Sequence, residues 1–252
     1  MAERDKSSWD PRLYGSTARF VSDLGATLVD MLDPKPGERV LDLGCGDGAL
    51  TQQLAERAAD VLGVDASEAM VAEARSRGLR AEVAGAYELD FEAEFDGALS
   101  NAAMHWMKRP DEVIRRVHRA LRPGGRFVGE FGGYGNVNAV CAGLRKALAR
   151  RGVDFDSLYP WYFPTVKEYR GRLEAHGFAV EHIELFDRPT PIPGDVAEWL
   201  ANFGETFLKA IPETDRPALL DEVTDTVRPI LCDANGGWTI DYVRLRFAAR
   251  KQ

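Results

Sequence analysis

The feature that most constrains the fold is a glycine-rich turn that directly follows a short apolar segment. Residues 40–43 read Val-Leu-Asp-Leu, which is typical of a buried strand, and Gly44, Gly46 and Gly48 come immediately after it. A helix is predicted next, over residues 49–58. Glycines at this point either simply allow a tight turn or let the backbone approach a ligand, to which the helix N-terminus offers free N–H groups. We favour the ligand-binding interpretation.

Strand and helix patterns alternate through the first half of the chain. Apolar runs predict strands over residues 40–43, 61–65, 81–84, 95–100 and 126–131, and helical periodicity predicts helices over residues 16–32, 49–58, 68–77 and 110–121. Such repeats form parallel sheets with right-handed crossovers. Two later strands are predicted over residues 179–186 and 238–247. The sequence therefore predicts an α/β fold, a doubly wound, Rossmann-like, seven-stranded and mostly parallel sheet with helices on both faces.

An acidic residue lies where the second predicted strand ends. Asp65 follows the glycine turn by about 20 residues, and a carboxylate there accepts hydrogen bonds from the ribose hydroxyls of an adenosine. Gly44, Gly46 and Ala49 also match the dinucleotide pattern G-x-G-x-x-G/A, so a nicotinamide-dependent oxidoreductase is an alternative. Asp42 favours a cofactor without phosphate, because a carboxylate repels a pyrophosphate. Asp42 can also be a buried acid tied to backbone amides of the loop.

Further segments resemble the class I S-adenosylmethionine-dependent methyltransferases, in the order in which that family has them. The matching segments are residues 40–48, residues 63–67 together with Met70, residues 95–96 and residues 121–125. The resemblance implies an enzyme that uses S-adenosyl-L-methionine as cofactor and leaves S-adenosyl-L-homocysteine as product.

The resemblance also implies which residues hold the cofactor. The glycine turn would surround the methionine part, the residues after the second strand would hold the ribose and adenine, and the end of the fourth strand would line the cofactor. In chain order the implied set is Tyr14, Asp42, Gly44, Cys45, Gly46, Asp65, Ala66, Met70, Ala86, Tyr87, Asn101 and Ala102. Many relatives place an Asp near the adenine amino group where this chain has Ala86, so Tyr87, Glu88 or the backbone must supply that contact.

The two ends of the chain resemble the trans-aconitate methyltransferase branch. The features are residues 9–14, residues 101–106 and a late helical pair, predicted over residues 195–210 and 215–231, that forms an insertion before the last strand. We therefore expect a single domain. Residues 1–38 would form an N-terminal helical cap and residues 39–131 the cofactor-binding core. Residues 132–177 and 190–236 would supply helical segments that form the substrate pocket or its lid.

The acceptor side is predicted from residues outside the cofactor motifs. The acceptor is expected to be a small molecule methylated on oxygen, either a carboxylate that needs no base or a hydroxyl that needs one. His105 is the first candidate for a base, because its ordinary pKa suits neutral pH, and Glu130 at the end of the fifth strand is the second. Alternatively, His105 only packs at a strand end and Glu130 is solvated. The candidate substrate-binding residues are the aromatic residues Trp9, Trp106, Tyr134 and Trp161.

Composition excludes several other classes of protein. The formal net charge of −8 disfavours nucleic acid as a partner. Three isolated cysteines, at positions 45, 141 and 232, argue against a structural metal site. The chain lacks a run of about 18 apolar residues and an apolar signal segment, so we expect neither a membrane span nor secretion, and a cytoplasmic location. A cofactor-binding protein without catalysis remains a further alternative.

Overall fold

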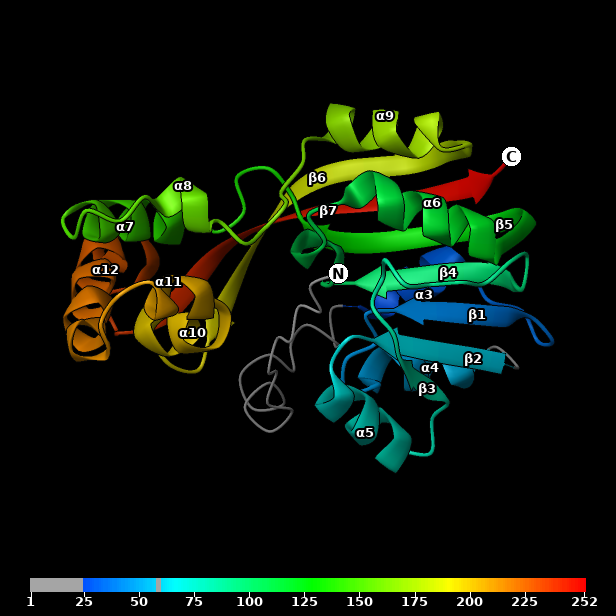
Figure 1. Cartoon of the computed structure of the whole chain (residues 1–252), viewed down its shortest axis with the longest axis horizontal. Helices are drawn as coiled ribbons and strands as arrows, with labels where there is room; N and C mark the ends of the chain where they lie inside the picture. The colour runs from blue at the N-terminus through cyan, green and yellow to red at the C-terminus, as the bar shows by residue number, and fades with distance from the viewer. Residues whose placement is uncertain (1–24, 58–59) are drawn as a thin grey trace.

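The computed structural model describes residues 25–57 and 60–252 (Figure 1). In this part of the chain, seven strands form one sheet in the order β3-β2-β1-β4-β5-β7-β6. Their bounds are Arg39–Leu43 (β1), Asp60–Asp65 (β2), Ala81–Val83 (β3), Phe95–Asn101 (β4), Leu121–Gly132 (β5), Phe178–Ile192 (β6) and Trp238–Lys251 (β7). The predicted segments of residues 1–24, including Trp9 and Tyr14, lie outside the described residues.

The first five strands are parallel to one another and the last two form a hairpin. β7 runs antiparallel to both β5 and β6, and its pairing with β6 extends from Phe178–Lys251 to Ile192–Trp238. The predicted seven-stranded and mostly parallel sheet is confirmed. β7 reverses direction because it returns from the far end of β6 after the inserted helices.

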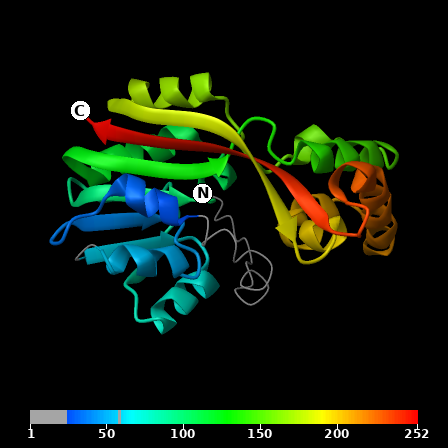
Figure 2. The same ribbon diagram turned by 180° about the vertical axis from the view of Figure 1, so that it is seen from behind.

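Helices cover both faces of the sheet, and strand residues alternate between them. α3 (Ala26–Leu32) and α4 (Ala49–Ala55) pack on one face, and α6 (Pro110–Ala120) and α9 (Val166–Ala175) on the other (Figures 1 and 2). In β1, Val40 joins the core under α3 and α4, whereas Leu41 and Leu43 join the core under α6 and α9. A smaller hydrophobic cluster packs under α5 (Glu68–Ser76). Ser67 caps the N-terminus of α5, because its hydroxyl accepts a hydrogen bond from the Met70 N–H at 3.3 Å.

A second hydrophobic core lies beyond the end of the sheet. We call its helices the helical lobe: α7 (Asn138–Ala149), α8 (Phe155–Leu158), α10 (Val196–Phe203), α11 (Glu205–Lys209) and α12 (Arg216–Leu231), with a 3-10 turn η2 (Glu213–Asp215) before α12. Figure 1 shows β6 and β7 running past the sheet into this lobe. The helical insertion before the last strand is therefore confirmed, and α7 and α8 complete the lobe from a second insertion after β5.

Several boundaries differ from the sequence prediction. β6 and β7 are longer than predicted, because beyond the sheet they pair only with each other and support the lobe. The predicted helix over residues 195–210 is two helices, broken at Gly204, where an added Cβ would lie 2.8 Å from the Leu200 carbonyl oxygen. Residues 123–125 lie within β5 as an irregularity in its pairing with β4, rather than before the strand.

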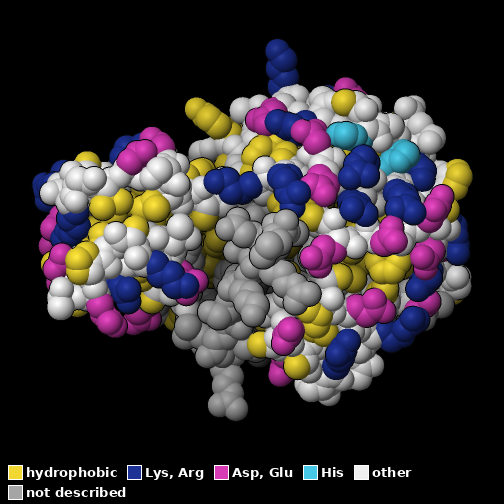
Figure 3. Space-filling view, viewed as in Figure 1, with side chains coloured by type: hydrophobic (Ala, Val, Ile, Leu, Met, Phe, Trp, Pro, Cys, Tyr) yellow, Lys and Arg dark blue, Asp and Glu magenta, His cyan; other side chains and the backbone are white. Residues whose placement is uncertain are grey.

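The surface over the sheet and its helices carries charged side chains of both signs on the face seen in Figure 3. In Figure 3, Lys and Arg side chains alternate with Asp and Glu side chains over this face, and exposed apolar atoms are scattered between them. Among residues 25–57 and 60–252, the structure contains no helix that is both long and apolar enough to cross a membrane.

Candidate active site

The predicted site residues gather at one edge of the sheet. The carboxyl ends of β1, β2 and β4 point toward the helical lobe (Figure 1). Ligands of open α/β sheets bind at this edge, because the loops and helix N-termini that follow the strands meet there. The glycine turn (residues 44–48) follows β1, Asp65 ends β2 and Asn101 ends β4, so three strands bring their last residues to one place.

The glycine turn is held by the neighbouring strand and by the segment after β4. The backbone N–H groups of Gly44 and Cys45 both donate to the Val64 carbonyl oxygen, at 2.8 and 3.1 Å. Gly44 has φ +73° and Gly46 has φ +54°. A Cβ on Gly44 would lie 2.3 Å from the Ala103 Cβ, whereas a Cβ on Gly46 would meet no atom of the described residues within 4 Å. Gly44 is therefore required for packing, and Gly46 leaves open space where a ligand can approach the backbone.

Asp65 connects the glycine turn to the start of α5. Its two carboxylate oxygens accept hydrogen bonds from the Gly46 N–H at 3.0 Å and the Ser67 N–H at 2.8 Å. Burial raises the pKa of Asp65, against the opposing effect of these backbone hydrogen bonds. A carboxylate can accept further hydrogen bonds, so this arrangement leaves Asp65 able to receive ligand hydroxyls.

Asp42 lies beneath the glycine turn and is only 2% exposed. Its carboxylate accepts a hydrogen bond of 2.6 Å from the Thr51 hydroxyl in α4, so the partner of this buried acid is a side chain of α4 and not the loop amides of the alternative interpretation. Burial, with a smaller contribution from Asp65, raises the pKa of Asp42 to about 7. Two carboxylates with raised pKa values at one edge favour a cationic ligand, because its charge would compensate theirs.

The other implied cofactor residues near this turn differ in exposure. The Cys45 side chain is buried with Val71 and Ala74 under α5, and burial raises the pKa of its thiol. Only the backbone of Cys45 is therefore available to a ligand. Ala66 is exposed and Met70 is buried at the start of α5.

The segment after β3 is anchored to the sheet core. Ala86 is buried in the core under α6 and α9, and Tyr87 packs against that core. The Arg109 guanidinium lies 3.8 Å from the centre of the Tyr87 ring, and the Arg109 N–H donates to the Tyr87 hydroxyl at 3.3 Å. Tyr87 is thus fixed by a cation–π contact and a hydrogen bond.

The end of β4 turns sharply beside the glycine turn. Ala102 has φ +53°, an uncommon conformation for a residue with a Cβ, and its N–H donates to the Glu130 carbonyl oxygen at 2.7 Å. The Ser100 hydroxyl donates to the Leu43 carbonyl oxygen at 2.8 Å and so ties β4 to the end of β1. Such strain persists only where surrounding contacts hold it, and it concentrates at functional sites.

His105 lies in the short 3-10 helix η1 (Met104–Trp106) and is 8% exposed. The Gly132 N–H at the end of β5 donates to its Nδ1 at 3.3 Å. Burial, and then the nearby charge of Arg244, lowers the pKa of His105 well below its ordinary value. Our reason for naming it as a base, an unperturbed pKa near neutrality, is therefore wrong, because a nitrogen that binds protons so weakly is a poor general base.

Glu130 is neither solvated nor available as a base. Its carboxylate is 2% exposed and accepts hydrogen bonds from two arginines of the neighbouring strands. Arg188 of β6 holds both oxygens, one through Nη1 and the other through Nη2 at 2.9 Å, and Arg246 of β7 binds Oε2 through Nε at 2.8 Å. The catalytic assignment of Glu130 is corrected, because these contacts make it a buried link across three strands.

The aromatic candidates divide into buried and exposed residues. Trp161 is 4% exposed at the centre of the lobe core and lies 5.9 Å from Trp106, measured between ring centres. Trp106 in turn lies 5.4 Å from His105, so a chain of rings joins the sheet edge to the lobe. Tyr134 is 65% exposed, and the described contacts do not bring its ring to this cluster. Trp9 and Tyr14 lie outside the described residues.

Sequence reasoning missed Arg244, Tyr242 and Phe163 at this edge. Arg244 is 6% exposed and lies over the Tyr242 ring, and Phe163 lies 5.9 Å from His105. The period of two over residues 238–247 could have indicated that Tyr242 and Arg244 share one face of a strand. Phe163 follows no regular pattern, so the sequence held no signal for it.

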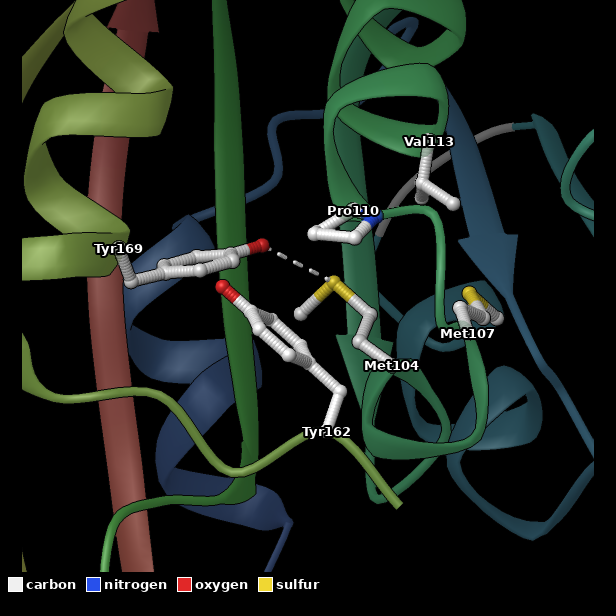
Figure 4. A pocket seen from close by; sticks show the side chains of 6 residues that line it. All are labelled: Met104, Met107, Pro110, Val113, Tyr162 and Tyr169. Atoms are coloured by element: carbon white, nitrogen blue, oxygen red, sulfur yellow. Dashed lines mark hydrogen bonds between the residues drawn. The ribbon is translucent and has the colours of Figure 1, made fainter. Parts of the chain in front are cut away.

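A small apolar hollow lies between η1, α6 and α9. Figure 4 shows its lining side chains, which come from η1 and the residue after it, from α6 and α9, and from the segment between α8 and α9: Met104, Met107, Pro110, Val113, Tyr162 and Tyr169. The Tyr169 hydroxyl donates to the Met104 sulfur at 3.5 Å. A lining of two hydroxyls and apolar groups suits packing rather than a charged cofactor.

Comparisons with known proteins show which family the chain is similar to. A family model described as "Methyltransferase domain" matches residues 41–129. An uncharacterized methyltransferase of Schizosaccharomyces pombe is 36% identical over 97% of this chain and 98% of its own length. A trans-aconitate 2-methyltransferase of Rhodococcus jostii is 30% identical over 90% of this chain and 91% of its own.

A solved structure of a methyltransferase is also similar to this chain. The crystal structure of an S-adenosylmethionine-dependent methyltransferase from Mesorhizobium loti matches with a TM-score of 0.56 and 25% identity, over 90% of this chain and 97% of that one. The sheet order and the glycine turn define the S-adenosylmethionine-dependent methyltransferase class. With the relatives above, this chain belongs to the S-adenosylmethionine-dependent methyltransferase family and is an enzyme of it. The matches do not favour the oxidoreductase alternative.

Proposed function

We propose that this enzyme binds S-adenosyl-L-methionine at the glycine turn and transfers its methyl group to an oxygen of a small molecule, preferably a carboxylate. The observation that carries the proposal is the open space at Gly46 beside the buried carboxylate of Asp42 and the partly buried carboxylate of Asp65. The ammonium and sulfonium groups of this cofactor would be attracted by the carboxylates of Asp42 and Asp65, whereas the pyrophosphate of a dinucleotide would be repelled.

The residues present fit that cofactor in three parts. The backbone at Gly46 would receive the methionine part, and Asp65 would accept hydrogen bonds from the ribose hydroxyls. Ala66 and Met70 would lie beside the adenine, with Asn101 and Ala102 along the other side. The cofactor supplies an activated methyl group on sulfur, so the protein has to align the acceptor and exclude water.

Two observations support a carboxylate acceptor. The Rhodococcus jostii relative is a trans-aconitate 2-methyltransferase, and trans-aconitate carries carboxylates. In the described part of this edge, the candidate bases are also unsuitable: Glu130 is paired with two arginines, and burial lowers the pKa of His105. A carboxylate is already ionised at neutral pH and needs no base, whereas a neutral hydroxyl does.

Calorimetric titration with S-adenosylhomocysteine tests the cofactor, with NADH titrated in parallel. We expect binding of the first alone, and Asp65→Ala should weaken it by about 2 kcal/mol, the loss expected for hydrogen bonds to a charged group. Glu56→Ala, at the exposed end of α4, is the control and should leave affinity unchanged. Binding of NADH alone would end the proposal.

The acceptor is tested with methyl-labelled S-adenosylmethionine and a panel of small molecules. Trans-aconitate and other small carboxylic acids form one arm, and phenols, alcohols and amines form the other. Labelled ester from the first arm supports the proposal. Label transferred only to amines would show that the acceptor atom is wrong while leaving the cofactor site intact.

A further inference from the structure

His105 has a defined place between the glycine turn and the helical lobe. Gly44 contacts Ala103, and His105 follows two residues later in η1. Its backbone carbonyl accepts the Tyr162 N–H at 2.8 Å, and its ring contacts those of Trp106 and Phe163, with ring centres at 5.4 and 5.9 Å. The ring therefore has aromatic neighbours on η1 and on the segment before α9, close to the edge of the sheet that carries the glycine turn.

The hydrogen bond from Gly132 decides which ring nitrogen carries the proton. A backbone N–H can only donate, so Nδ1 of His105 must be the unprotonated nitrogen that accepts it, at 3.3 Å. In the neutral imidazole the proton then resides on Nε2, on the opposite side of the ring. Gly132 is paired with Arg244 of β7 at the end of β5, so the sheet positions the donor.

The charged and titratable groups around the ring oppose a second proton. Arg244 of β7 places a buried positive charge nearby, and its effect on His105 adds to that of burial. Glu130 of β5 directs its carboxylate to Arg188 and Arg246, and the Tyr162 hydroxyl donates to Glu168 at 2.9 Å. The described carboxylates next to this segment are thus committed elsewhere.

We infer that His105 is a neutral hydrogen-bond donor, which uses Nε2–H to hold one oxygen of the acceptor while the other oxygen is methylated. This inference rests on the proposed function. The Gly132 amide is the device that sets the tautomer, and Arg244 adds positive charge that favours an anionic acceptor.

The role is consistent with the balance of the reaction. The acceptor oxygen forms a bond to the methyl carbon, the carbon–sulfur bond breaks, and its electron pair stays on sulfur. A carboxylate becomes a neutral ester without losing a proton, so His105 keeps its proton throughout. A general base, in contrast, would have to present a free lone pair, and the lone pair of His105 faces Gly132.

Nitrogen NMR of the histidine side chains tests the tautomer directly in the full chain. The chain has four histidines, and the spectrum of His105→Gln assigns the His105 signals by difference. We expect His105 to stay neutral with its proton on Nε2 throughout the neutral pH range, with and without S-adenosylhomocysteine, because burial and Arg244 lower its pKa well below the ordinary value. A proton on Nδ1, or protonation within that range, would overturn the inference.

Two amide variants separate a donor from a base and from a structural role. His105→Gln can place an N–H near the position of Nε2, whereas His105→Asn can reach only the position of Nδ1. With the best carboxylate of the acceptor panel, we expect Gln to retain kcat/KM within a few fold and Asn to lose roughly 10- to 100-fold, the loss for a hydrogen bond to a charged group. The kcat/KM of the wild type should show no ionisation of His105 near neutral pH, because the residue is already neutral there.

The outcomes distinguish this inference from the proposed function. Equal, large losses in Gln and Asn together with a rising pH–rate limb near neutrality would establish a base and refute the donor role. Equal losses that follow a lower melting temperature would show that His105 is only structural. If S-adenosylhomocysteine does not bind, the proposed function fails, whereas the NMR result still decides the tautomer.

Discussion

Gly46 and Gly37 both have positive φ, but only Gly46 lies in the glycine turn. Their φ values are +54° and +89°, and a Cβ at either would meet no atom of the described residues within 4 Å. Gly46→Ala and Gly37→Ala should therefore each cost stability of about 1 kcal/mol, from backbone strain alone. Only Gly46→Ala should also weaken binding of S-adenosylhomocysteine, by at least tenfold, because its methyl group would occupy the open space. Chemical denaturation and calorimetry measure the two effects, and equal affinities in both variants would remove Gly46 from the site.

Asp42 should make stability fall as pH rises. The folded pKa of about 7 exceeds the ordinary value of 3.8, so between these values the folded chain holds a proton that the unfolded chain has lost. Its contribution to stability is therefore full below about pH 4 and is lost by pH 7. Relative to the wild type, Asp42→Asn should gain stability, on the order of a few kcal/mol, as pH rises over this range.

Urea unfolding of Asp42→Asn and the wild type from pH 4 to pH 8 checks this expectation. A stability difference that does not change with pH would contradict it. Thr51→Val is the informative companion variant, because the Thr51 hydroxyl lowers the pKa of Asp42. Its removal should extend the pH-dependent range upward.

At the scale of the elements, the buried link around Glu130 holds β5, β7 and β6 together. Glu130→Gln would leave Arg188 and Arg246 without their shared carboxylate, and the loss of one partner from a buried ionic cluster costs about 3–5 kcal/mol. We expect that decrease in the free energy of unfolding by denaturant titration. Glu205→Gln breaks an exposed pair with Lys209 within α11 and should cost less than about 0.5 kcal/mol. An inactive but fully stable Glu130→Gln would instead restore Glu130 as a base.

Helix and strand ends were predictable where a local signal existed. Ser67 and Thr165 cap α5 and α9 as their sequence positions indicate, through bonds to the N–H groups of Met70 and Glu168. The break at Gly204 was not predicted, because helical periodicity continues across it and only the close approach of Leu200 shows it. The ends of β6 and β7 were also missed, since their outer halves depend on each other rather than on the sheet.

At the scale of the whole molecule, two separate cores should respond separately to mutation. Trp161 lies in the lobe core with Trp199 and Phe207, whereas the glycine turn rests on the sheet cores. Trp161→Ala should cost about 3–5 kcal/mol of lobe stability, from lost burial and the cavity left behind. We expect faster hydrogen exchange in α10 and α12, lower methyl transfer, and S-adenosylhomocysteine affinity close to that of the wild type.

Ile230→Ala provides the control for this prediction. Ile230 is also an apolar residue of the lobe, on α12, but it is 69% exposed. Its loss should change neither exchange nor activity. Exchange that increases equally in the sheet and the lobe of Trp161→Ala would show that the two cores unfold as one unit.

The sequence by itself determined the sheet, the glycine turn and the position of Asp65. These features depend on local periodicity and on residues close together in the chain, so their pattern carries the information. The family could be inferred from the same segments, because their order is part of the sequence.

Only the tertiary structure decided what the charged residues do. Glu130 has its partners 58 and 116 residues further along the chain, and the proton of His105 is directed by a backbone N–H 27 residues away. Burial and such distant partners set pKa values and hydrogen-bonding roles, and no local pattern records them. For that reason the position of the site was predictable, whereas the roles of Glu130 and His105 were not.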